Sequence, residues 1–260
     1  MHLAHQQLFK KLDKNGAIVV ICTGYANLSP YVNRAEHTNF PLFYYPLENI
    51  KHLTGEEFLN LLKEEFPNLK KIVVGYDFHF GTKAAYSTDD LKELFNGEVE
   101  IVDEYKLDGI AIHSRVIRSF LREGKLDEAN KILGYNYAIK GTHIKGQGLG
   151  AKQFVPTINI NVEEFLIPQE GIYITQTTIS GKSYKSVSFI GHRVTTDGKF
   201  AVETHILDES FNEEIAITIS IEFFKKIRDN KKFEQYVDLK RQILTDIQQA
   251  NKWFEKREIK

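Results

Sequence analysis

Two groups of residues have the types and spacing that nucleotide phosphate chemistry requires. The first group joins His2 and His5 to the segment 114–118, and the second joins the segment 156–159 to Glu203. Each combines short side chains carrying nitrogen or oxygen with a charged residue, and such sets can hold a phosphate or the Mg²⁺ that accompanies it. Two such groups in a chain of 260 residues predict two linked ATP-dependent reactions.

The front group depends on a helix that is predicted to start at Ser114. Serine is a good N-cap residue, and the free N–H groups at a helix N-terminus can bind an anion. Arg118 follows on the first turn, where its guanidinium can hold a phosphate with two hydrogen bonds. His2 and His5 are too few to bind zinc without a cysteine partner. The alternative is an ordinary capped helix with a solvated arginine and two surface histidines.

The loop 75–81 is a second candidate part of the front site. It follows the predicted strand 72–75, and ligands of parallel sheets bind at the carboxyl ends of the strands. We expect Asp77 and Phe78 to contribute to nucleotide binding there, because an aromatic ring can pack on a planar base. The alternative is that Phe78 and Phe80 belong to the hydrophobic core.

The back group begins with a glycine-rich stretch that contains Gly146, Gly148 and Gly150. Glycines let a backbone approach phosphates closely. Thr157 and Asn159 follow, and their short oxygen-bearing side chains suit a hydrated Mg²⁺. The alternative is a flexible loop that leads into a strand, since a glycine stretch alone is weak evidence for a ligand site.

Glu203 lies within a predicted strand at 200–207. Because side chains alternate along a strand, Glu203 and His205 share one face, and the opposite face carries Phe200, Val202, Thr204 and Ile206. The face with Glu203 is either plain solvent-exposed surface or the place where a carboxylate takes a proton from a substrate hydroxyl.

The elements that position these residues change in kind along the chain. In the front half, predicted strands at 17–22, 42–45, 72–75 and 99–102 alternate with helices, among them 87–95, 127–133 and one with a capping box at Thr54 and Glu57. Such alternation is typical of a parallel, doubly wound sheet. In the back half, short strands at 172–178, 184–190, 200–207 and 215–221 have period-two patterns typical of an antiparallel barrel or sandwich. An amphipathic helix ends the chain, with one stripe formed by Tyr236, Leu239, Ile243, Ile247, Ala250 and Phe254.

Composition narrows the class of protein and its partners. The net charge of −1 gives no basic field for nucleic acid, and the longest apolar runs are too short to span a bilayer. Cys22 is the only cysteine, so no disulfide can form within the chain, which fits a reducing compartment. We expect a cytoplasmic protein with no nucleic-acid or membrane partner and at most weak self-association.

In its ordered set of motifs, the chain resembles the bacterial bifunctional riboflavin kinase/FMN adenylyltransferase (FAD synthetase) family. The likeness extends over essentially the whole chain, and no single motif decides it. The matching pieces are His2–His5, Gly75–Gly81, Ser114–Arg118, Gly124, Ala129, Leu133-Gly134, Pro156–Asn159, Pro168, Gly171–Tyr173, Ile190-Gly191, Glu203–Asp208 and Ile227-Arg228.

The resemblance implies a two-domain fold in which each domain catalyses one reaction. A Rossmann-like nucleotidyltransferase domain over residues 1–136, with a parallel sheet, would be followed by an antiparallel riboflavin kinase β-barrel with a terminal helix over 137–260. The kinase would phosphorylate riboflavin to FMN with ATP and Mg²⁺, and the front domain would adenylylate FMN to FAD. In the family, the equivalent of Glu203 is the base, and Thr157 and Asn159 hold Mg²⁺ and phosphate. His2, His5 and Arg118 would stabilise charge in adenylyl transfer, while Ser114, Asp77, Phe78, Gly146, Gly148, Gly150 and Arg228 would bind nucleotide or flavin.

The sequence departs from the family pattern at several positions. Ala4 replaces the glycine of the HxGH motif, and the family's strand and Gly-x-Phe-Asp-Gly turn before the first histidine are missing, so we expect the natural protein to begin upstream of Met1. Three other functions stay open on the sequence alone. They are a monofunctional riboflavin kinase with a scaffold front domain, a nucleotidyltransferase for another phosphorylated small molecule, and a flavin-binding regulator without catalysis.

Overall fold

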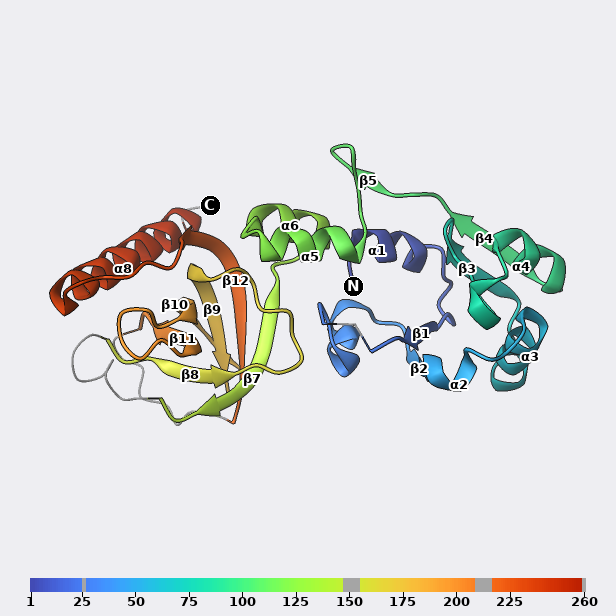
Figure 1. Cartoon of the computed structure of the whole chain (residues 1–260). Coiled ribbons are helices and arrows are strands. Elements are labelled where there is room, and N and C mark those ends of the chain that lie inside the picture. The colour runs from blue at the N-terminus through green and yellow to red at the C-terminus, as the bar shows by residue number, and fades with distance from the viewer. Residues whose placement is uncertain (25–26, 147–154, 209–216, 259–260) are drawn as a thin grey trace. The chain divides into compact units, whose positions relative to one another are not determined.

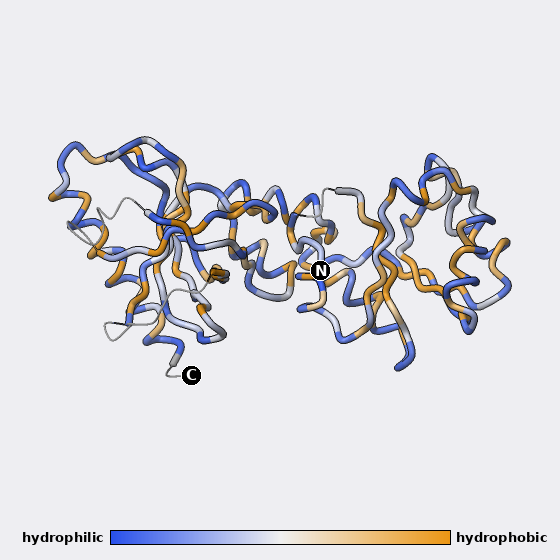
Figure 2. Tube along the Cα trace, turned by 90° about the horizontal axis from the view of Figure 1, so that it is seen from below, coloured by the Kyte–Doolittle hydropathy of each residue, from blue (hydrophilic) through white to orange (hydrophobic). Residues whose placement is uncertain are grey.

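The computed structural model describes residues 1–24, 27–146, 155–208 and 217–258. The chain forms two compact units, Met1–Ser114 and Arg115–Lys260, and each is described by itself. Hydrophobic and hydrophilic stretches alternate along the chain in both units (Figure 2). No helix within the described ranges is both long and apolar enough to cross a membrane.

The first unit contains four parallel strands and several helices, as the sequence predicted (Figure 1). Its elements are α1 (Leu3–Phe9), β1 (Ile18–Cys22), η1 (Tyr31–His37), β2 (Leu42–Pro46), α2 (Leu47–Ile50), α3 (Gly55–Glu65), β3 (Lys71–Gly75), η2 (Thr82–Ala84), α4 (Thr88–Leu94), β4 (Glu98–Val102), β5 (Lys106–Leu107) and β6 (Ile110–Ala111).

The parallel strands form two separate pairs instead of one continuous sheet. Strand β1 pairs with β2, beginning at Ile18 opposite Leu42, and β3 pairs with β4, beginning at Lys71 opposite Glu98. A single sheet needs a hydrogen-bonded link between the two pairs, and no strand of the described residues supplies it. The expected parallel pairing is therefore confirmed, and in the described residues it takes the form of two pairs.

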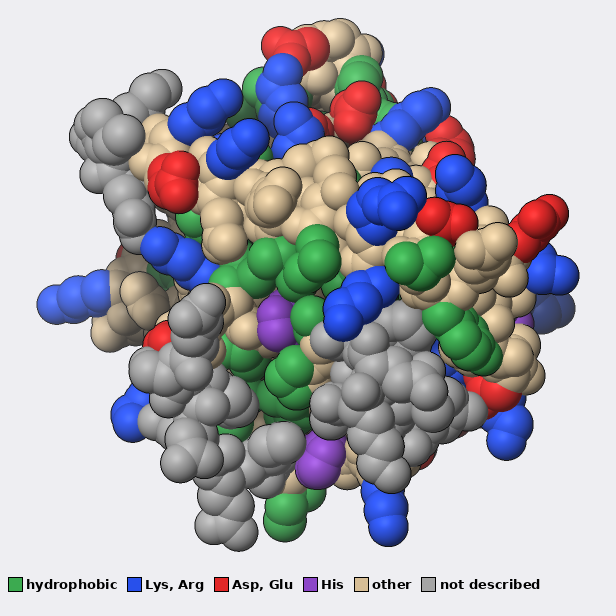
Figure 3. Space-filling model, turned by 90° about the vertical axis from the view of Figure 1, so that its left-hand side faces the viewer, with side chains coloured by type: hydrophobic (Ala, Val, Ile, Leu, Met, Phe, Trp, Pro, Cys, Tyr) green, Lys and Arg blue, Asp and Glu red, His purple; other side chains and the backbone are tan. Residues whose placement is uncertain are grey.

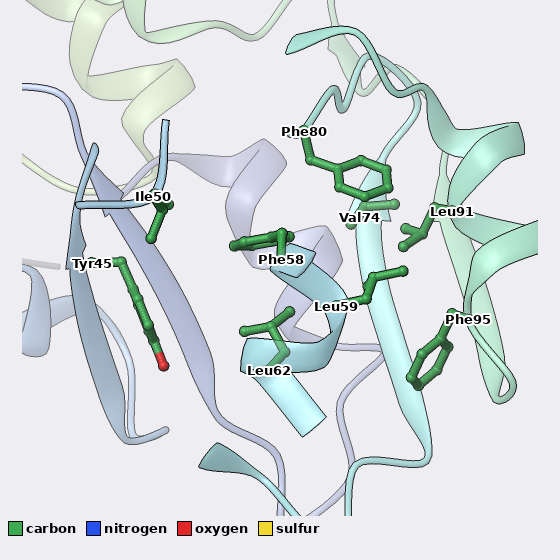
Figure 4. Close-up of a cluster of buried hydrophobic side chains, with 9 residues drawn as sticks. All are labelled: Tyr45, Ile50, Phe58, Leu59, Leu62, Val74, Phe80, Leu91 and Phe95. Carbon is green, nitrogen blue, oxygen red and sulfur yellow. The ribbon is translucent and has the colours of Figure 1, made fainter. Parts of the chain in front are cut away.

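A common hydrophobic core holds the two pairs together. Helix α3 contributes Phe58, Leu59 and Leu62, which pack with Tyr45 of β2 and Val74 of β3 (Figure 4). The helix starts where the sequence predicted. The Thr54 hydroxyl accepts a hydrogen bond from the Glu57 N–H at 3.2 Å, and the Glu57 carboxylate accepts one from the Thr54 N–H at 2.8 Å. This reciprocal cap fixes the first turn of α3 and hence the direction in which its apolar face points.

The second unit is a closed antiparallel barrel of six strands, with helices before and after it. Its elements are α5 (Ser114–Arg122), α6 (Leu126–Leu133), β7 (Ala138–Ile144), β8 (Ile158–Asn161), β9 (Gly171–Ile179), β10 (Lys182–His192), β11 (Phe200–Ile206), β12 (Thr218–Arg228) and α8 (Tyr236–Glu258). The strand order is β10-β11-β8-β7-β12-β9, and each neighbouring pair is antiparallel. The barrel and its terminal helix confirm the predicted fold class.

The predicted alternation in β11 is present. Val202, Thr204 and Ile206 are buried inside the barrel, whereas Glu203 and His205 lie on the outer face. Phe200 departs from the pattern, because it lies at the first position of the strand and is 44% exposed. The predicted strand at 215–221 starts later, at Thr218, and continues to Arg228; residues 215 and 216 lie outside the described ranges.

A ring of five hydroxyl groups occupies part of the barrel interior. Each of the five side chains is fully buried and bonds to two of the others, at 2.8 to 3.0 Å. In order around the ring they are Thr175, Ser186, Thr177, Thr204 and Ser188. Because a hydroxyl has one proton to donate, a ring in which each donates once and accepts once satisfies all five donors. These five hydroxyl groups are thus buried in the barrel with every donor bonded.

The contact boundary between the two units differs in position from the domain boundary expected after residue 136. Helix α6 is tied to the barrel, because the Asn130 amide donates to the Phe223 carbonyl at 2.9 Å and its oxygen accepts from the Tyr137 N–H at 2.8 Å. Helices α5 and α6 therefore belong to the same compact unit as the barrel. The functional division at 136 stays a prediction.

Candidate functional site

One row of cross-strand neighbours runs around the barrel and gathers the predicted back-site residues. The recorded pairings place Ile144 opposite Asn159, Asn159 opposite Glu203, Glu203 opposite Phe189, Phe189 opposite Ile172, and Ile172 opposite Arg228. Neighbours in one row project from the same face of a sheet. The row therefore takes one side chain from each of the six strands.

All members of this row line a pocket of about 490 Å³. Its polar end contains Thr157, Asn159 and Glu203, and its apolar end lies between the barrel and the first half of α8. In the view of Figure 3, hydrophobic side chains gather at the centre, and basic and acidic side chains lie around them. The dimensions and the mixture of apolar walls with a few polar groups are typical of a site for a small organic ligand.

Three predicted residues meet at the polar end. The Thr157 hydroxyl lies 3.4 Å from Glu203 Oε2, and Asn159 is the direct cross-strand neighbour of Glu203. Gly146 packs against Asn159 so closely that an added Cβ would lie 2.3 Å from the Asn159 amide nitrogen. A larger residue at position 146 would therefore displace the Asn159 amide from its present position. Gly148 and Gly150 lie outside the described residues.

Glu203 is a largely buried carboxylate with one cationic partner. Burial raises the pKa of Glu203 above its ordinary value, although the guanidinium of Arg193 and the Thr157 hydroxyl act in the opposite direction. Arg193 Nη1 lies 3.1 Å from Glu203 Oε1. A carboxylate with a raised pKa accepts a proton more readily than an ordinary surface glutamate, which suits a general base.

The apolar end is formed where α8 lies against the barrel. The second half of the helix packs closely, with Ala250 and Phe254 buried against the barrel, while Leu239, Ile243 and Ile247 of the predicted stripe line the pocket. Ile172, Val187 and Phe189 supply the opposite wall. Two apolar walls facing each other form a slot that suits a flat ring system.

Arg228 lies at this end of the pocket and is held by α8. Its Nε and Nη2 donate to the Asp246 carboxylate, with distances between 2.7 and 3.1 Å, and Gln242 donates to the same carboxylate at 2.9 Å. Asp246 is almost fully buried. The structure places Arg228 in the pocket wall, where it also joins the helix to the barrel; its predicted role in ligand binding stays a prediction.

The donor set at the polar end fits Mg²⁺. Thr157 and Asn159 present hydroxyl and amide oxygens there, and the described residues contain no cluster of three or more acidic, histidine or cysteine side chains. Mg²⁺ is commonly held by few protein oxygens together with water and substrate phosphates. A nucleotide-bound Mg²⁺ is therefore compatible with these residues.

The histidines of the front group differ from the surface alternative. His2 is buried, the His2 and His5 rings stack with centroids 3.8 Å apart, and the His2 N–H donates to His5 Nδ1 at 3.3 Å. Burial, with the positive charges of the amino group and Arg34, lowers the pKa of His5 to about 4. His5 is therefore neutral near pH 7 and can offer a hydrogen bond through Nε2, though not a positive charge.

The remaining front residues are distributed over both units. Asp77 is exposed in the loop after β3, and Phe78 is partly buried and stacks on the core residue Phe80, with centroids 5.7 Å apart. Helix α5 begins at Ser114, so this serine is the first helical residue instead of the predicted N-cap. Arg118 lies in the second unit, and burial and Arg122 lower its pKa. The ligand-binding roles of these residues stay predictions.

Sequence reasoning missed several residues of the pocket. Arg193 and Asp246 line the pocket and bond to the predicted residues Glu203 and Arg228, and Asp197, which is not part of the lining, bonds to Arg193. The period-two pattern gave no indication of Arg193 or Asp197, because both lie in the hairpin loop between β10 and β11. The sequence does carry a signal for Asp246, which is a charged residue beside the apolar stripe of α8.

Two family models match the chain. A model described as riboflavin kinase matches residues 133–254, and one described as FAD synthetase matches residues 42–116. The first range contains the barrel, the pocket residues and most of α8, and the second contains β2, β3 and β4.

Similar proteins cover most of the chain. A bifunctional riboflavin kinase/FMN adenylyltransferase of Listeria monocytogenes is 34% identical over 74% of this chain and 62% of its own length. One from Buchnera aphidicola is 30% identical over 80% of this chain and 69% of its own length. A crystal structure described as a macrolide-efflux protein from Streptococcus pneumoniae superposes with a TM-score of 0.82 at 27% identity, over 97% of this chain and 90% of that one.

Proposed function

This chain belongs to the bifunctional riboflavin kinase/FMN adenylyltransferase family, and we propose that its barrel transfers the γ-phosphoryl group of ATP to the 5′-hydroxyl of riboflavin. The observation that carries the proposal is the row around the barrel, which sets the carboxylate of Glu203 between an Mg²⁺-compatible end and an apolar slot. The slot suits the isoalloxazine ring, and the polar end suits the hydroxyl and the phosphates.

The residues support a direct transfer. The oxygen of the riboflavin 5′-hydroxyl forms a bond to the γ-phosphorus of ATP, and Glu203 accepts the proton that this hydroxyl loses. The bond between the γ-phosphorus and the bridging oxygen breaks, and ADP leaves. Thr157 and Asn159 hold the phosphates and orient them toward that hydroxyl. Mg²⁺, when bound, neutralises charge on the phosphate oxygens. The walls from α8 and the barrel exclude water, which limits the hydrolysis of ATP.

We expect the purified protein to convert riboflavin to FMN when ATP and Mg²⁺ are present. Separation of flavins by chromatography measures the product directly. Removal of divalent cations with a chelator should abolish FMN formation, and added Mg²⁺ should restore it, because phosphoryl transfer from ATP relies on a metal to offset phosphate charge. Formation of FMN at an unchanged rate in the chelator would contradict the assigned Mg²⁺ site, and no FMN under any condition would contradict the kinase assignment.

We further propose that the front residues serve adenylyl transfer from ATP to FMN, which yields FAD and pyrophosphate. The match to the FAD synthetase model over residues 42–116 supports this second reaction. By the family resemblance, His5 would donate a hydrogen bond in this reaction and Arg118 would stabilise phosphate charge. The substrates of both reactions are small molecules, namely riboflavin, FMN and ATP, and we place the protein in the cytoplasm.

Arg118→Ala is expected to lower FAD formation at least about tenfold, the effect of losing one charge-assisted hydrogen bond. FMN formation in the same mixture should stay near the wild-type level, because Arg118 is not among the residues that line the barrel pocket. Both products are quantified in one chromatogram, so the kinase is the internal control. Equal loss of the two products would indicate a folding defect and would refute the separation into two sites.

A further inference from the structure

Arg193 is the first residue of the loop that joins β10 to β11, and backbone hydrogen bonds fix its position. Its N–H donates to the Lys199 carbonyl at 2.9 Å, and its own carbonyl accepts from the N–H groups of Thr196 and Gly198 at 2.9 and 3.1 Å. Gly198 has a φ of +69°, which a glycine adopts without strain. The backbone of the loop is therefore well determined, and it directs the side chain of Arg193 back along β11 toward Glu203.

The guanidinium group of Arg193 lies between two carboxylates. Its Nε lies 3.1 Å from Asp197 Oδ1 and its Nη2 3.2 Å from Asp197 Oδ2, while Nη1 lies 3.1 Å from Glu203 Oε1. The three side chains are only 18% to 21% exposed. Asp197 thus lies along one edge of the guanidinium, with a hydrogen bond from Nη2 and an ion-pair contact to Nε, which makes no hydrogen bond to a described residue. Glu203 receives a single bond from Nη1, and its other oxygen faces Thr157.

This arrangement keeps a net negative charge on the cluster. One guanidinium and two carboxylates sum to −1, so Glu203 is held without being fully neutralised. If Asp197 were absent, the planar fork of Arg193 would be free to take both oxygens of Glu203. The Glu203 oxygen that faces the pocket would then be turned away from a substrate hydroxyl. The loop therefore has the geometry to orient Glu203 by one oxygen only.

We propose that Arg193, itself held by Asp197, is a positioning residue that fixes the orientation of Glu203 in phosphoryl transfer. The inference rests on the proposed kinase function and adds to it a device that none of the sequence motifs contains. Arg193 acts through Glu203 and is not a phosphate ligand, because the guanidinium is already engaged by two carboxylates. A catalytic group held within a narrow range of orientations reacts faster than one that samples several rotamers.

The test compares steady-state kinetics of FMN formation in Arg193→Met, Arg193→Lys and the wild type. Arg193→Met keeps most of the apolar stem and removes the charge, so kcat should fall about tenfold while KM for ATP and for riboflavin changes less than about threefold. Arg193→Lys restores a cation that can bond Glu203 and should recover part of the lost kcat. A packing role alone would be met equally well by methionine. Arg241→Met is the matched control, since Arg241 forms an exposed pair with Asp238 away from the pocket.

A double variant separates positioning from direct phosphate binding. If Arg193 acts through Glu203, Arg193→Met should add less than about a twofold loss in a Glu203→Gln background, because the group it orients is gone. A multiplicative loss in the double variant, or a rise of about tenfold in KM for ATP in Arg193→Met, would overturn the proposal and make Arg193 a phosphate ligand. Unchanged kcat in Arg193→Met would also overturn it.

Asp197→Asn provides a second route if Arg193→Met does not fold, as judged by circular dichroism and thermal melting. This variant keeps the shape of the loop and removes the charge that holds the guanidinium. It should lower kcat about threefold to tenfold with KM unchanged, and wild-type kcat would refute the role of the loop. Absence of FMN with the wild-type protein would instead refute the kinase function itself, so the two failures are distinguishable.

Discussion

Glu203→Gln is expected to lower the rate of FMN formation about 100-fold or more, the usual contribution of a general base. Glutamine keeps the shape of the side chain. Its single amide oxygen can accept the hydrogen bond from Arg193, and its NH2 group then takes the place of Oε2 beside the Thr157 hydroxyl, which can turn to accept. It cannot take the proton of the riboflavin hydroxyl, which must then leave without assistance. The variant therefore removes the base and leaves the pocket nearly intact.

The measurement is kcat for FMN formation, with KM for riboflavin as a second readout. KM should change little, because Glu203 contacts the hydroxyl and not the ring in the proposed arrangement. Glu222→Gln is a matched control. Glu222 lies on β12 of the same barrel, where it accepts a hydrogen bond from Asn136 at 2.8 Å, and it does not line the pocket. Wild-type turnover in a well-folded Glu203→Gln protein would show that Glu203 is not the base.

The sequence predicted the site best where a residue's role follows from strand periodicity. Val202, Thr204 and Ile206 point into the barrel, so Glu203 must point outward, and this was deducible from alternation alone. The capping box at Thr54 and the stripe of α8 were equally local. Patterns with a period of two or about four residues record which face is buried, and burial is what they predict.

Features that depend on the pairing of distant segments were not predictable in this way. The sequence does not indicate that Asn159 lies beside Glu203, which follows it by 44 positions. The register between β8 and β11 is set by the closed barrel. The link from Arg228 to Asp246 likewise joins β12 to α8 across the loop between them. The arrangement of the front strands as two pairs also depends on distant segments. The sequence of each strand would be the same in two pairs and in one continuous sheet.

The hydroxyl ring inside the barrel shows why a pattern of buried positions does not specify the chemistry of the core. Alternation marks Thr175, Thr177, Ser186, Ser188 and Thr204 as inward-facing, yet serine and threonine are mostly surface residues and give no expectation of a closed network. Only the structure shows that each hydroxyl lies within 3.0 Å of two others. The network has a direct consequence for stability.

Thr177→Val should destabilise the barrel by about 2 to 3 kcal/mol, although valine matches threonine in shape and is more apolar. The substitution removes the bonds to Ser186 and Thr204 and opens the ring into a chain of four hydroxyls. One end of that chain keeps a buried donor without an acceptor, which is the costly state of a polar group in a core. The methyl group that valine carries in place of the hydroxyl fills about the same volume. The substitution therefore gains little packing to offset this loss.

The measurement is the free energy of unfolding from denaturant titration, with Thr178→Val as the matched control. Thr178 is the next residue on β9, and its hydroxyl bonds to Ser183 at 2.9 Å on the solvent-accessible side. Water replaces that bond when it is lost, so the control should change the free energy by less than about 0.5 kcal/mol. Equal effects of the two substitutions would show that the ring contributes no more than a surface hydrogen bond. A larger loss at Thr177 alone would establish that the closed ring, and not β-propensity in this strand, is the source of the stability.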